Sequence, residues 1–559
     1  MVKTHLVRPG DRRATRNLSA VAGLKFGDAV VHLDLDRVKL DRGSKRAMEA
    51  FKHTPDPLIE AWVTHRKLLE ATRPGDTVLM SDWRGLGGVF ALAQWSLPPG
   101  ERRTVVTVAG DSAALQWLDV AGTIDDLPMP LASQVDWEIA QYEWSHEVVA
   151  LSEYVFDLLG DLVIRGDLPA PQGRSSAPVS DSSVVWAPEP VGRRSRTGDI
   201  LRALTSLDGS RLVVSESDEE DKVWSGTSWD ALQHARAVLG NRVERAANVA
   251  EPTVIVLGDP FSVPDDGVET MVDRGVPVVV PARSAAAARW PTAPTWTTTD
   301  ELVDALNGGP AATSTPAHRR PRRRVEAPER GRRISVGVPV FRDVRFLEEC
   351  LASILGQDLE PTEVIIVDDG SGSEEVDDAL ESARSKDGRI RILRGEHRGV
   401  CVARNRALEE MTGDSFLFVD SDDVLEPAFL GRCAEMLRSD DRLMAVATWT
   451  RFFGAYEGIE AKPPFDARVG SRENPIISTA ALVDMRAREL GVRYQPELAF
   501  LYCEDWHFWS QVVAAGGRIG LIPEALVRHR VHQASGGFLR TDLALALGRG
   551  RAVEPLRRR

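Results

Sequence analysis

Residues 334–423 contain, in order, ISVGVPVF (334–341), EVIIVDDGSGS (363–373), CVARNRALEE (401–410) and SFLFVDSDD (415–423). Three of these segments hold a short β-branched, aliphatic or aromatic run that ends in polar turn residues, which is typical of buried parallel strands. The expected strands are Ile334 to Val340, Glu363 to Val367 and Ser415 to Val419, and apolar residues recur with helical period in 346–355, 376–383 and 402–411. This alternation predicts a mostly parallel α/β sheet that binds its ligand at the carboxyl ends of the strands.

Aspartates directly follow two of these strands. Asp368 and Asp369 come after the second strand, and Asp420, Asp422 and Asp423 come after the third. Carboxylates gathered at one edge of a sheet would repel one another unless a cation neutralised them. We therefore expect a divalent metal, Mn²⁺ or Mg²⁺, that holds a diphosphate, with Asp420 and Asp422 as oxygen ligands. A single cluster would favour a role in turns and helix N-termini instead, but two clusters after two strands favour the metal.

The motifs between about residues 333 and 540 resemble, in type and order, those of family 2 glycosyltransferases, which have the GT-A fold. The matching motifs are VPVF (338–341), Gln357 after the first helix, VDDGS (367–371), ARN (403–405), VDSDD (419–423) and CED (503–505). One departure is Arg342, which stands where the family's opening motif usually has asparagine. This difference leaves the preference for a donor open.

The resemblance implies a role for each motif. Donor binding would fall to Pro339, Val340, Phe341, Asp368, Asp369, Arg404 and Asp420. One of Asp368 and Asp369 would accept the N–H of a uracil-like base. Metal binding would fall to Asp420, Asp422 and His532, since a neutral imidazole is a competent ligand. The alternatives are an exposed salt bridge for Arg404 and a purely structural place for His532.

Direct displacement of a nucleotide diphosphate also needs a base that removes the proton of the acceptor hydroxyl. The stretch FLYCEDWHFWSQVV places Glu504 and Asp505 at the start of a helical pattern. By resemblance, Asp505 is the general base of an inverting transferase, with Glu504 beside it. The alternative is an acid pair that the helix dipole favours. Tyr502, Trp506 and Trp509 offer aromatic faces for sugar rings, with one tryptophan expected in the core.

The composition is that of a soluble globular protein of three or four domains, with 559 residues, 43% hydrophobic and 27% charged. The net charge of −14 argues against nucleic acid as the main partner. The four cysteines lack metal-ligand spacing, which disfavours structural zinc and a disulfide framework. Because we find neither an apolar run of 18 residues nor a secretory signal, we expect a cytoplasmic protein.

Residues 1–310 alternate again, in two α/β lobes that we expect at 1–175 and 184–310. The strand candidates are GDAVVHLDL (27–35), DTVLMSD (76–82), RTVVTVAGD (103–111), HEVVALSE (146–153), RLVVSES (211–217), PTVIVLGD (252–259) and VPVVVPA (276–282), with a helix at Trp229 to Leu239. The turn RGLGG (84–88) could present backbone N–H groups to an anion. It lacks the spacing of a dinucleotide fingerprint, however, and a tight strand-to-helix turn needs glycine for its own sake. The structural explanation is therefore favoured.

This half faintly resembles the GT-B glycosyltransferases. The resemblance lies in VALSEYVFDLL (149–159) and in FSVPDDGVETMVDRGVPVVV (261–280). Glu269 matches the second acid of that family's E-x7-E donor segment, whereas Phe261 occupies the place of the first acid. Because a phenyl ring cannot accept hydrogen bonds from a sugar, we predict a degenerate transferase-like module for acceptor recognition or assembly.

An arginine-rich linker is predicted at 311–333, ahead of the GT-A domain at 334–540. Its segment HRRPRRRVEAPERGRR (318–333) has eight arginines and should be extended. A basic tail follows at 541–559. Such runs are usually solvated tethers, but in an acidic protein they could contact anionic lipid at the inner face of the membrane, at about 1 kcal/mol per arginine. Tether and peripheral membrane contact both stay open.

The sequence therefore predicts a metal-dependent, inverting glycosyltransferase of cell-surface polysaccharide biosynthesis or a related process. It would transfer a sugar from a nucleotide-diphosphate sugar, with a UDP-sugar favoured, to a hydroxyl of a glycan, lipid-linked or small-molecule acceptor. The alternative is a non-catalytic sugar-nucleotide-binding or scaffolding protein, which the degenerate N-terminal half suggests. A nucleotidyltransferase is the weaker third option, because VPVFRDVRF (338–346) has no glycine-rich loop.

Overall fold

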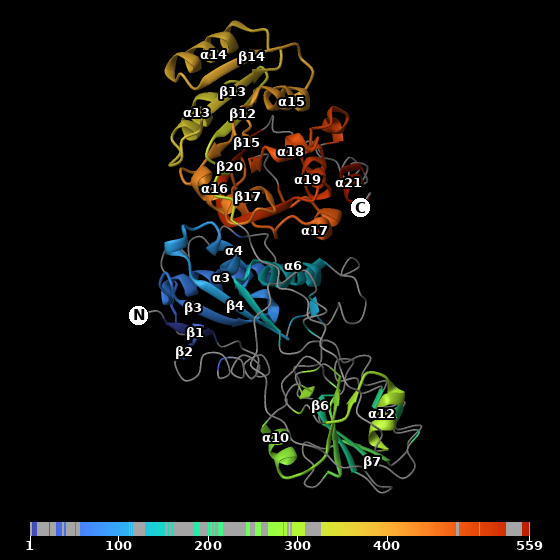
Figure 1. Ribbon diagram of the computed structural model, residues 1–559. Helices are drawn as coiled ribbons and strands as arrows, with labels where there is room; N and C mark the ends of the chain where they lie inside the picture. The colour runs from blue at the N-terminus through green and yellow to red at the C-terminus, as the bar shows by residue number, and fades with distance from the viewer. Residues whose placement is uncertain are drawn as a thin grey trace.

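The computed structural model describes residues 3–7, 22, 30–35, 38–40, 51, 56–110, 112, 114–115, 129–150, 155, 159, 184–190, 199–200, 202–203, 206, 211–215, 242–245, 252–258, 266–282, 284, 286–287, 290, 293–307, 326–476, 480–501, 503–532 and 551–557. Within these residues, no helix is both long enough and apolar enough to cross a membrane. They form three sheets, built from residues 4–150, 184–296 and 334–531 (Figure 1). Parallel strands flanked by helices occur in all three, which confirms the predicted α/β class.

The parallel part of the C-terminal sheet is centred on β12 (Ile334–Val340). It pairs with β13 (Glu363–Asp368) on one side and β15 (Ser415–Phe418) on the other, and β14 (Ile390–Arg394) extends the sheet beyond β13. The strand order β14-β13-β12-β15 reverses direction at β12, and such a switch point is where α/β sheets bind ligands. The predicted strands match these to within one residue.

The remaining strands turn the sheet back toward this switch point. They are β16 (Val424–Leu425), β17 (Leu443–Gly454), β18 (Gly458–Glu460), β19 (Leu482–Asp484) and β20 (Arg518–Val531). β19 lies antiparallel between β15 and β17, and β20 runs parallel to β17. β16 pairs antiparallel with β20, with Val424 opposite Arg528. This pairing brings the end of β20 beside the acidic loop that follows β15.

Helices cover the sheet and supply its other functional side chains. They are α13 (Leu347–Leu355), α14 (Glu374–Lys386), α15 (Val400–Glu410), α16 (Phe429–Arg438), α17 (Ala467–Arg472), α18 (Arg486–Glu489) and α19 (Glu504–Ala514). The first three confirm the predicted helices. A short helix from the predicted tail, α21 (Glu554–Arg557), packs on α19, and Ala552 and Val553 just before it are buried.

Each N-terminal lobe has a parallel sheet of its own. The first has β1 (Thr4–Val7), β2 (Val30–Leu33), β3 (Thr77–Ser81), β4 (Thr104–Ala109) and β5 (Glu147–Ala150), with α3 (Asp56–Ala71), α4 (Gly88–Gln94) and α6 (Met129–Trp144). The second has β6 (Val184–Pro190), β7 (Arg211–Ser215), β8 (Val243–Arg245), β9 (Val254–Val256), β10 (Val278–Pro281) and β11 (Thr295–Trp296), with α10 (Asp266–Asp273) and α12 (Thr299–Leu306). Their orders, β2-β1-β3-β4-β5 and β11-β10-β9-β6-β7-β8, are the two common doubly wound arrangements. The domain boundaries stay a prediction.

The glycine-rich turn after β3 serves packing. A Cβ on Gly85, whose φ is +64°, would lie 2.7 Å from the backbone N of Glu138, and one on Gly88 would lie 2.7 Å from the carbonyl oxygen of Trp137. The N–H of Gly87 already donates to Oε1 of Gln141 at 2.9 Å. The glycines thus allow α6 to pack closely on this turn. This agrees with the structural role that the sequence favoured over anion binding.

Several sequence predictions fall outside the described residues. They include the helix at Trp229 to Leu239, Phe261, Tyr502, the linker up to residue 325 and most of the tail. Glu269 is described and lies in α10. Membrane contact through the linker and tail therefore stays a prediction.

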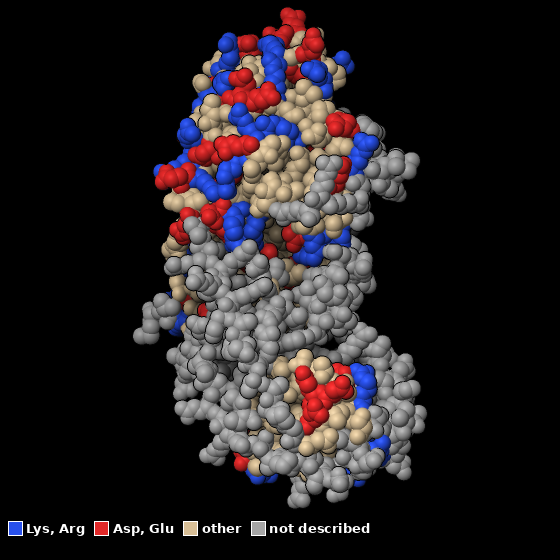
Figure 2. All heavy atoms as spheres, turned by 45° about the vertical axis from the view of Figure 1, so that its right-hand side comes forward, with Lys and Arg blue, Asp and Glu red and all other residues tan. Residues whose placement is uncertain are grey.

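The surface of the C-terminal domain mixes both charges on the face that Figure 2 shows. There, basic and acidic side chains alternate among the described residues. The C-terminal domain also has exposed ion pairs, such as Lys386 with Glu348 and Arg384 with Glu381. Pairs of this kind contribute little stability, about 0–1 kcal/mol each.

Candidate active site at the carboxyl edge of the C-terminal sheet

The strand register brings the two acidic clusters to one edge of the sheet. Val340, the last residue of β12, pairs with Asp368, the last residue of β13. On the other side of β12, the N–H of Val419 donates to the carbonyl oxygen of Gly337, so that Asp420 follows at the same edge. The parallel fold therefore brings together acids that are some fifty residues apart in the sequence.

The carboxylate of Asp369 is hydrogen-bonded to the loop that precedes α15. It accepts the backbone N–H groups of Arg398 at 2.9 Å and Gly399 at 2.8 Å, and Nδ1 of His397 lies 2.8 Å from Oδ2. Asp368 forms a tighter local turn, because its Oδ1 accepts the N–H of Ser371 at 3.0 Å. Both aspartates are buried. The sequence predicted their position, but not these partners.

A cavity of about 250 Å³ opens beside the two aspartates. Its lining includes Asp368, Asp369, Glu396, Arg398, Val402 and Arg406. Of the residues in the opening motif, Val340 is buried, Pro339 is partly buried, and the ring of Phe341 stacks on the imidazole of His397 with centroids 3.9 Å apart. Arg342 follows with a φ of +61°, an uncommon conformation for a residue other than glycine.

Arg404 connects Asp420, a predicted metal ligand, with Asp505, the predicted general base. Its Nη2 donates to Oδ1 of Asp420 at 2.8 Å, and its Nη1 donates to Oδ1 of Asp505 at 3.2 Å and lies 3.7 Å from Oε1 of Glu504. The guanidinium also lies 5.1 Å above the ring centroid of Tyr494. Only 4% of the Arg404 side chain is exposed. The alternative of an exposed salt bridge for Arg404 is therefore wrong.

The charge of Arg404 is stabilised in place. Burial by itself would lower the pKa of the guanidinium, but the negative charges of Asp420 and Asp505 raise that pKa well above its usual value. Arg404 is therefore a fixed cation between two carboxylates. Asp420, Glu504 and Asp505 are thus part of one connected cluster.

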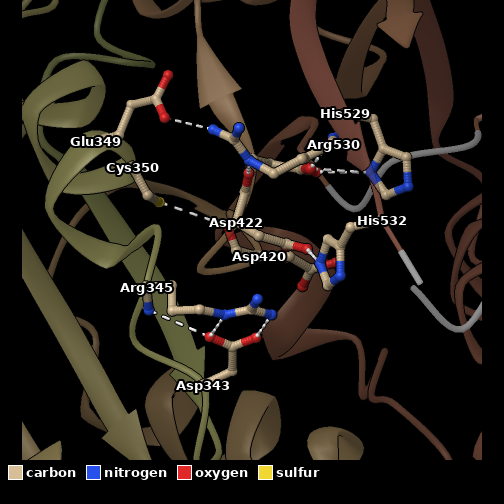
Figure 3. Close-up of polar contacts among 10 residues, drawn as sticks. Asp343, Arg345, Glu349, Cys350, Asp420, Asp422, His529, Arg530 and His532 are labelled. Carbon is tan, nitrogen blue, oxygen red and sulfur yellow. Dashed lines mark hydrogen bonds and ion pairs between the residues drawn. The ribbon is translucent and has the colours of Figure 1, made fainter. Parts of the chain in front are cut away.

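The loop after β15 is tied to β20 by histidines (Figure 3). Nε2 of His532 lies 2.9 Å from Oδ2 of Asp422, and Nδ1 of His529 lies 3.0 Å from Oδ2 of Asp423. Burial raises the pKa of Asp423 to about 6. Burial opposes protonation of His529, yet its hydrogen bond to Asp423 raises the imidazole pKa to about 9. At neutral pH these two residues form a buried ion pair.

Arg530, between the two histidines, is a functional candidate that the sequence analysis missed. Its Nε donates to the carbonyl oxygen of Asp422 at 3.0 Å, and its Nη2 pairs with Glu349 (Figure 3). Its guanidinium also lies 4.1 Å from the ring centroid of Phe346. Its place between His529 and His532 in the sequence could have indicated it.

Two of the predicted metal ligands lie next to each other at this edge. Asp422 and His532 bring a carboxylate oxygen and an imidazole nitrogen to one point. Oδ1 of Asp420 is engaged by Arg404, so Asp420 would coordinate through its other oxygen. Among the described residues, no group of three or more His, Cys, Asp and Glu side chains is arranged to hold a metal. Mg²⁺ usually binds one or two carboxylates and completes its shell with substrate phosphates and water. Asp420 and Asp422 could supply these carboxylates.

The tryptophans of α19 are both core residues. Trp506 is 8% exposed and Trp509 is 1% exposed, and Nε1 of Trp506 donates to the carbonyl oxygen of Gly470 at 2.7 Å. We expected one of them to offer a face to a sugar ring, and the structure corrects this, since neither does. Helical spacing alone does not reveal which face of α19 is covered by α17.

Comparison with known proteins matches residues 335–495 to the family described as Glycosyl transferase family 2. The chain is 35% identical over 106 residues to the putative glycosyltransferase EpsH of Bacillus subtilis, covering 19% of this chain and 30% of that protein. It is 26% identical over 220 residues to an uncharacterized glycosyltransferase of Haemophilus influenzae, covering 36% and 65%. The matches thus span less than two thirds of these relatives.

Two solved structures also align with this chain. One is S. aureus TarS 1–349 in complex with UDP-GlcNAc, at 22% identity and a TM-score of 0.32, covering 37% of this chain and 61% of that one. The other is the mannosyltransferase PcManGT of Pyrobaculum calidifontis in complex with GDP-Man and Mn²⁺, at 17% identity and a TM-score of 0.30, covering 42% and 75%. In its motifs and in the family match, the segment 335–495 of this chain is therefore similar to glycosyl transferase family 2 domains.

Proposed function

We propose that this protein is a metal-dependent, inverting glycosyltransferase. It transfers a sugar from a nucleotide-diphosphate sugar, with a UDP-sugar as the favoured donor, to a hydroxyl of a glycan, lipid-linked or small-molecule acceptor. The observation that carries this proposal is the Arg404 bridge, which holds Asp420 and Asp505 against one guanidinium although they lie 85 residues apart in the sequence. The match to a glycosyl transferase family supports it.

The donor lies along the carboxyl edge of the sheet. Its base occupies the cavity lined by Asp368 and Asp369. The imidazole of His397, which stacks on Phe341, is hydrogen-bonded to the same Asp369. Pro339 and Val340 are the last residues of β12, the strand next to β13, and we assign them to the donor side because Val340 pairs with Asp368. The diphosphate then points toward Asp420, Asp422 and His532. Asp420, Asp422 and His532 would hold a divalent metal there, and its charge would stabilise the leaving diphosphate.

Asp505 acts on the acceptor. Its carboxylate takes the proton of the attacking hydroxyl, and a hydroxyl that attacks from the side opposite the diphosphate inverts the anomeric centre. The hydrogen bond from Arg404 to Oδ1 of Asp505 orients this carboxylate. Glu504, beside it at the start of α19, adds negative charge that keeps Arg404 in place.

The test is turnover by the full-length protein. Nucleotide diphosphate release is measured with a panel of nucleotide sugars, Mn²⁺, and oligosaccharide and lipid-linked acceptors. Asp505→Asn should lower turnover about 10²–10⁴-fold, while binding of the nucleotide diphosphate by titration calorimetry is kept. Asp378→Asn, an exposed acid on α14, is the matched control and should keep full activity.

Two results would overturn the proposal. Full activity of Asp505→Asn would remove its proposed base. Metal-dependent binding of a nucleotide diphosphate by the unmodified protein, with no turnover on any donor and acceptor, would instead identify a sugar-nucleotide-binding protein.

A further inference from the structure

Helix α6 of the first lobe packs on the C-terminal domain through one face. Asp136, Trp137, Glu143 and Trp144 lie on this face, because residues seven apart lie on the same side of a helix. Asp136 pairs with Arg468 and with Arg472, whose Nη2 lies 2.6 Å from Oδ2 of Asp136. Glu143 pairs with Arg518 at 3.2 Å, and the rings of Trp137 and Trp449 meet edge to face. We call these four residues the α6 contact face.

The arginines that Asp136 holds belong to α17, which also contacts α19. The carbonyl oxygen of Gly470, between the two arginines, accepts Nε1–H of Trp506 at 2.7 Å. A Cβ at Gly470 would lie 2.5 Å from the ring of Phe465, so this helix sits close against its surroundings. Trp506 directly follows the proposed base Asp505. A short chain of contacts therefore joins the first lobe to the start of α19.

Asp136 is the carboxylate of the first lobe that pairs with both arginines of α17, while Asp466, the N-cap of α17, also pairs with Arg468. The side chain of Asp136 is 2% exposed, and that of Arg472 is 11% exposed. Both hydrogen bonds of the Arg472 guanidinium within the described residues go to Asp136, while its buried Nε and Nη1 have no hydrogen-bond partner there. Removing one partner of a buried ion pair leaves the other charge uncompensated. Without Asp136, α17 would have to shift so that Arg472 could reach water.

We propose that Asp136 is a positioning residue for the transfer reaction. It holds α17, and through the bond between Gly470 and Trp506 it holds the start of α19, so that Asp505 stays against Arg404. The role in turnover rests on the proposed function. The donor side belongs to other elements, β13 and the loop after β15, so a change at Asp136 affects turnover and spares nucleotide binding.

Turnover of full-length variants tests this role. Asp136→Asn should lower the turnover number about 10- to 100-fold, as expected for a misplaced catalytic group, with the affinity for the free nucleotide diphosphate unchanged. Asp136→Glu should restore part of the rate. The matched control is Glu143→Gln, on the same contact face but paired with Arg518, and it should keep the rate. Trp506→Phe breaks the same chain of contacts, so its effect and that of Asp136→Asn should be less than additive.

Hydrogen–deuterium exchange tests the contact chain without any substrate. In Asp136→Asn, peptides covering 464–476 and 503–509 should exchange faster than in Glu143→Gln, while those covering 363–369 stay unchanged. Trp506→Phe should raise exchange in 503–509 as well, which keeps the test valid if Asp136→Asn does not fold. Equal exchange at 503–509 in the Asp136 and Glu143 variants, or unchanged exchange in Trp506→Phe, overturns the positioning role. Failure of the transferase proposal is separate, because it would appear as no turnover by the unmodified protein.

Discussion

Arg404 shows why this position requires arginine. A guanidinium is planar and presents donors on two nitrogens, so it can reach Asp420 with Nη2 and Asp505 with Nη1 at the same time. An ammonium group is a single point charge and cannot span both carboxylates in fixed geometry. The guanidinium of Arg404 also packs over the ring of Tyr494. Arg404 thus fixes the distance between Asp420 and Asp505 and compensates the negative charge of both carboxylates.

Replacing Arg404 should therefore reduce both stability and activity. Arg404→Met leaves partly buried carboxylates unpaired, and we expect the free energy of unfolding to fall by about 3 kcal/mol. Arg404→Lys should keep more of the stability but lose most of the turnover. Urea unfolding followed by tryptophan fluorescence measures the first effect. Arg384→Met, at an exposed pair on α14, is the control, with an expected loss below about 1 kcal/mol; equal losses would contradict the bridge.

At the scale of elements, β20 completes the site that the parallel strands begin. Its pairing with β16 places His529 beside Asp423, and His532, just past the strand end, beside Asp422. Two of the carboxylates in the loop after β15, which would otherwise repel each other, therefore each have a histidine as a hydrogen-bond partner. Because Asp423 is fully buried, its pairing with His529 also contributes to stability.

The stability contributed by His529 should depend on pH. Its folded pKa of about 9 lies above the value near 6.5 of an unpaired histidine, so its contribution is fully present below pH 6.5 and is lost as pH rises through 9. The maximum effect of such a shift is about 3 kcal/mol. We expect the difference in thermal midpoint between the unmodified protein and His529→Gln to shrink steadily from pH 6.5 to pH 9. A difference that stays constant over this range would show that the pair does not titrate as described.

At the scale of the whole molecule, the three sheets do not form three separate cores. One hydrophobic cluster runs from the first lobe into the C-terminal domain, where Trp449 meets both Phe51 and Trp137. Arg432 of α16 adds polar contacts, with its Nη2 donating to Oγ of Ser96 at 2.6 Å. The core of the second lobe around Trp296 belongs to other clusters. The sheets of the first lobe and of the C-terminal domain therefore share a core, although the second lobe lies between them in the sequence.

This arrangement predicts two cooperative units in calorimetry. Trp449 is 2% exposed, and Trp449→Ala should lower the stability of the unit formed by the first lobe and the C-terminal domain by about 3–5 kcal/mol. Trp296→Ala should lower only the transition of the second lobe. Three independent transitions, or a Trp449→Ala effect confined to the C-terminal domain, would contradict the shared core.

Within residues 334–423, local pattern was sufficient to predict the elements. The strands β12, β13 and β15 and the helices α13 to α15 were predicted to within a few residues, because strand and helix periods are properties of neighbouring residues. The acids at the strand ends were predicted for the same reason. The motif order further indicated the family, and the family match agrees. In the first lobe, by contrast, β1 was missed, since four residues are too few to show a period.

By itself, the sequence of this protein determined the α/β class, the strand ends that carry the acids, and the residues from which an active site could be built. Three features were decided by the tertiary structure alone. They are the hydrogen bonds of Asp369 to the loop 397–399, the burial of Trp506 and Trp509, and the packing of α6 on the C-terminal domain. These depend on contacts between residues far apart in the chain, 101 residues for Arg404 with Asp505 and 336 for Arg472 with Asp136. A local pattern carries no information about which distant surface will cover a side chain, and burial, which depends on that surface, sets both charge and accessibility.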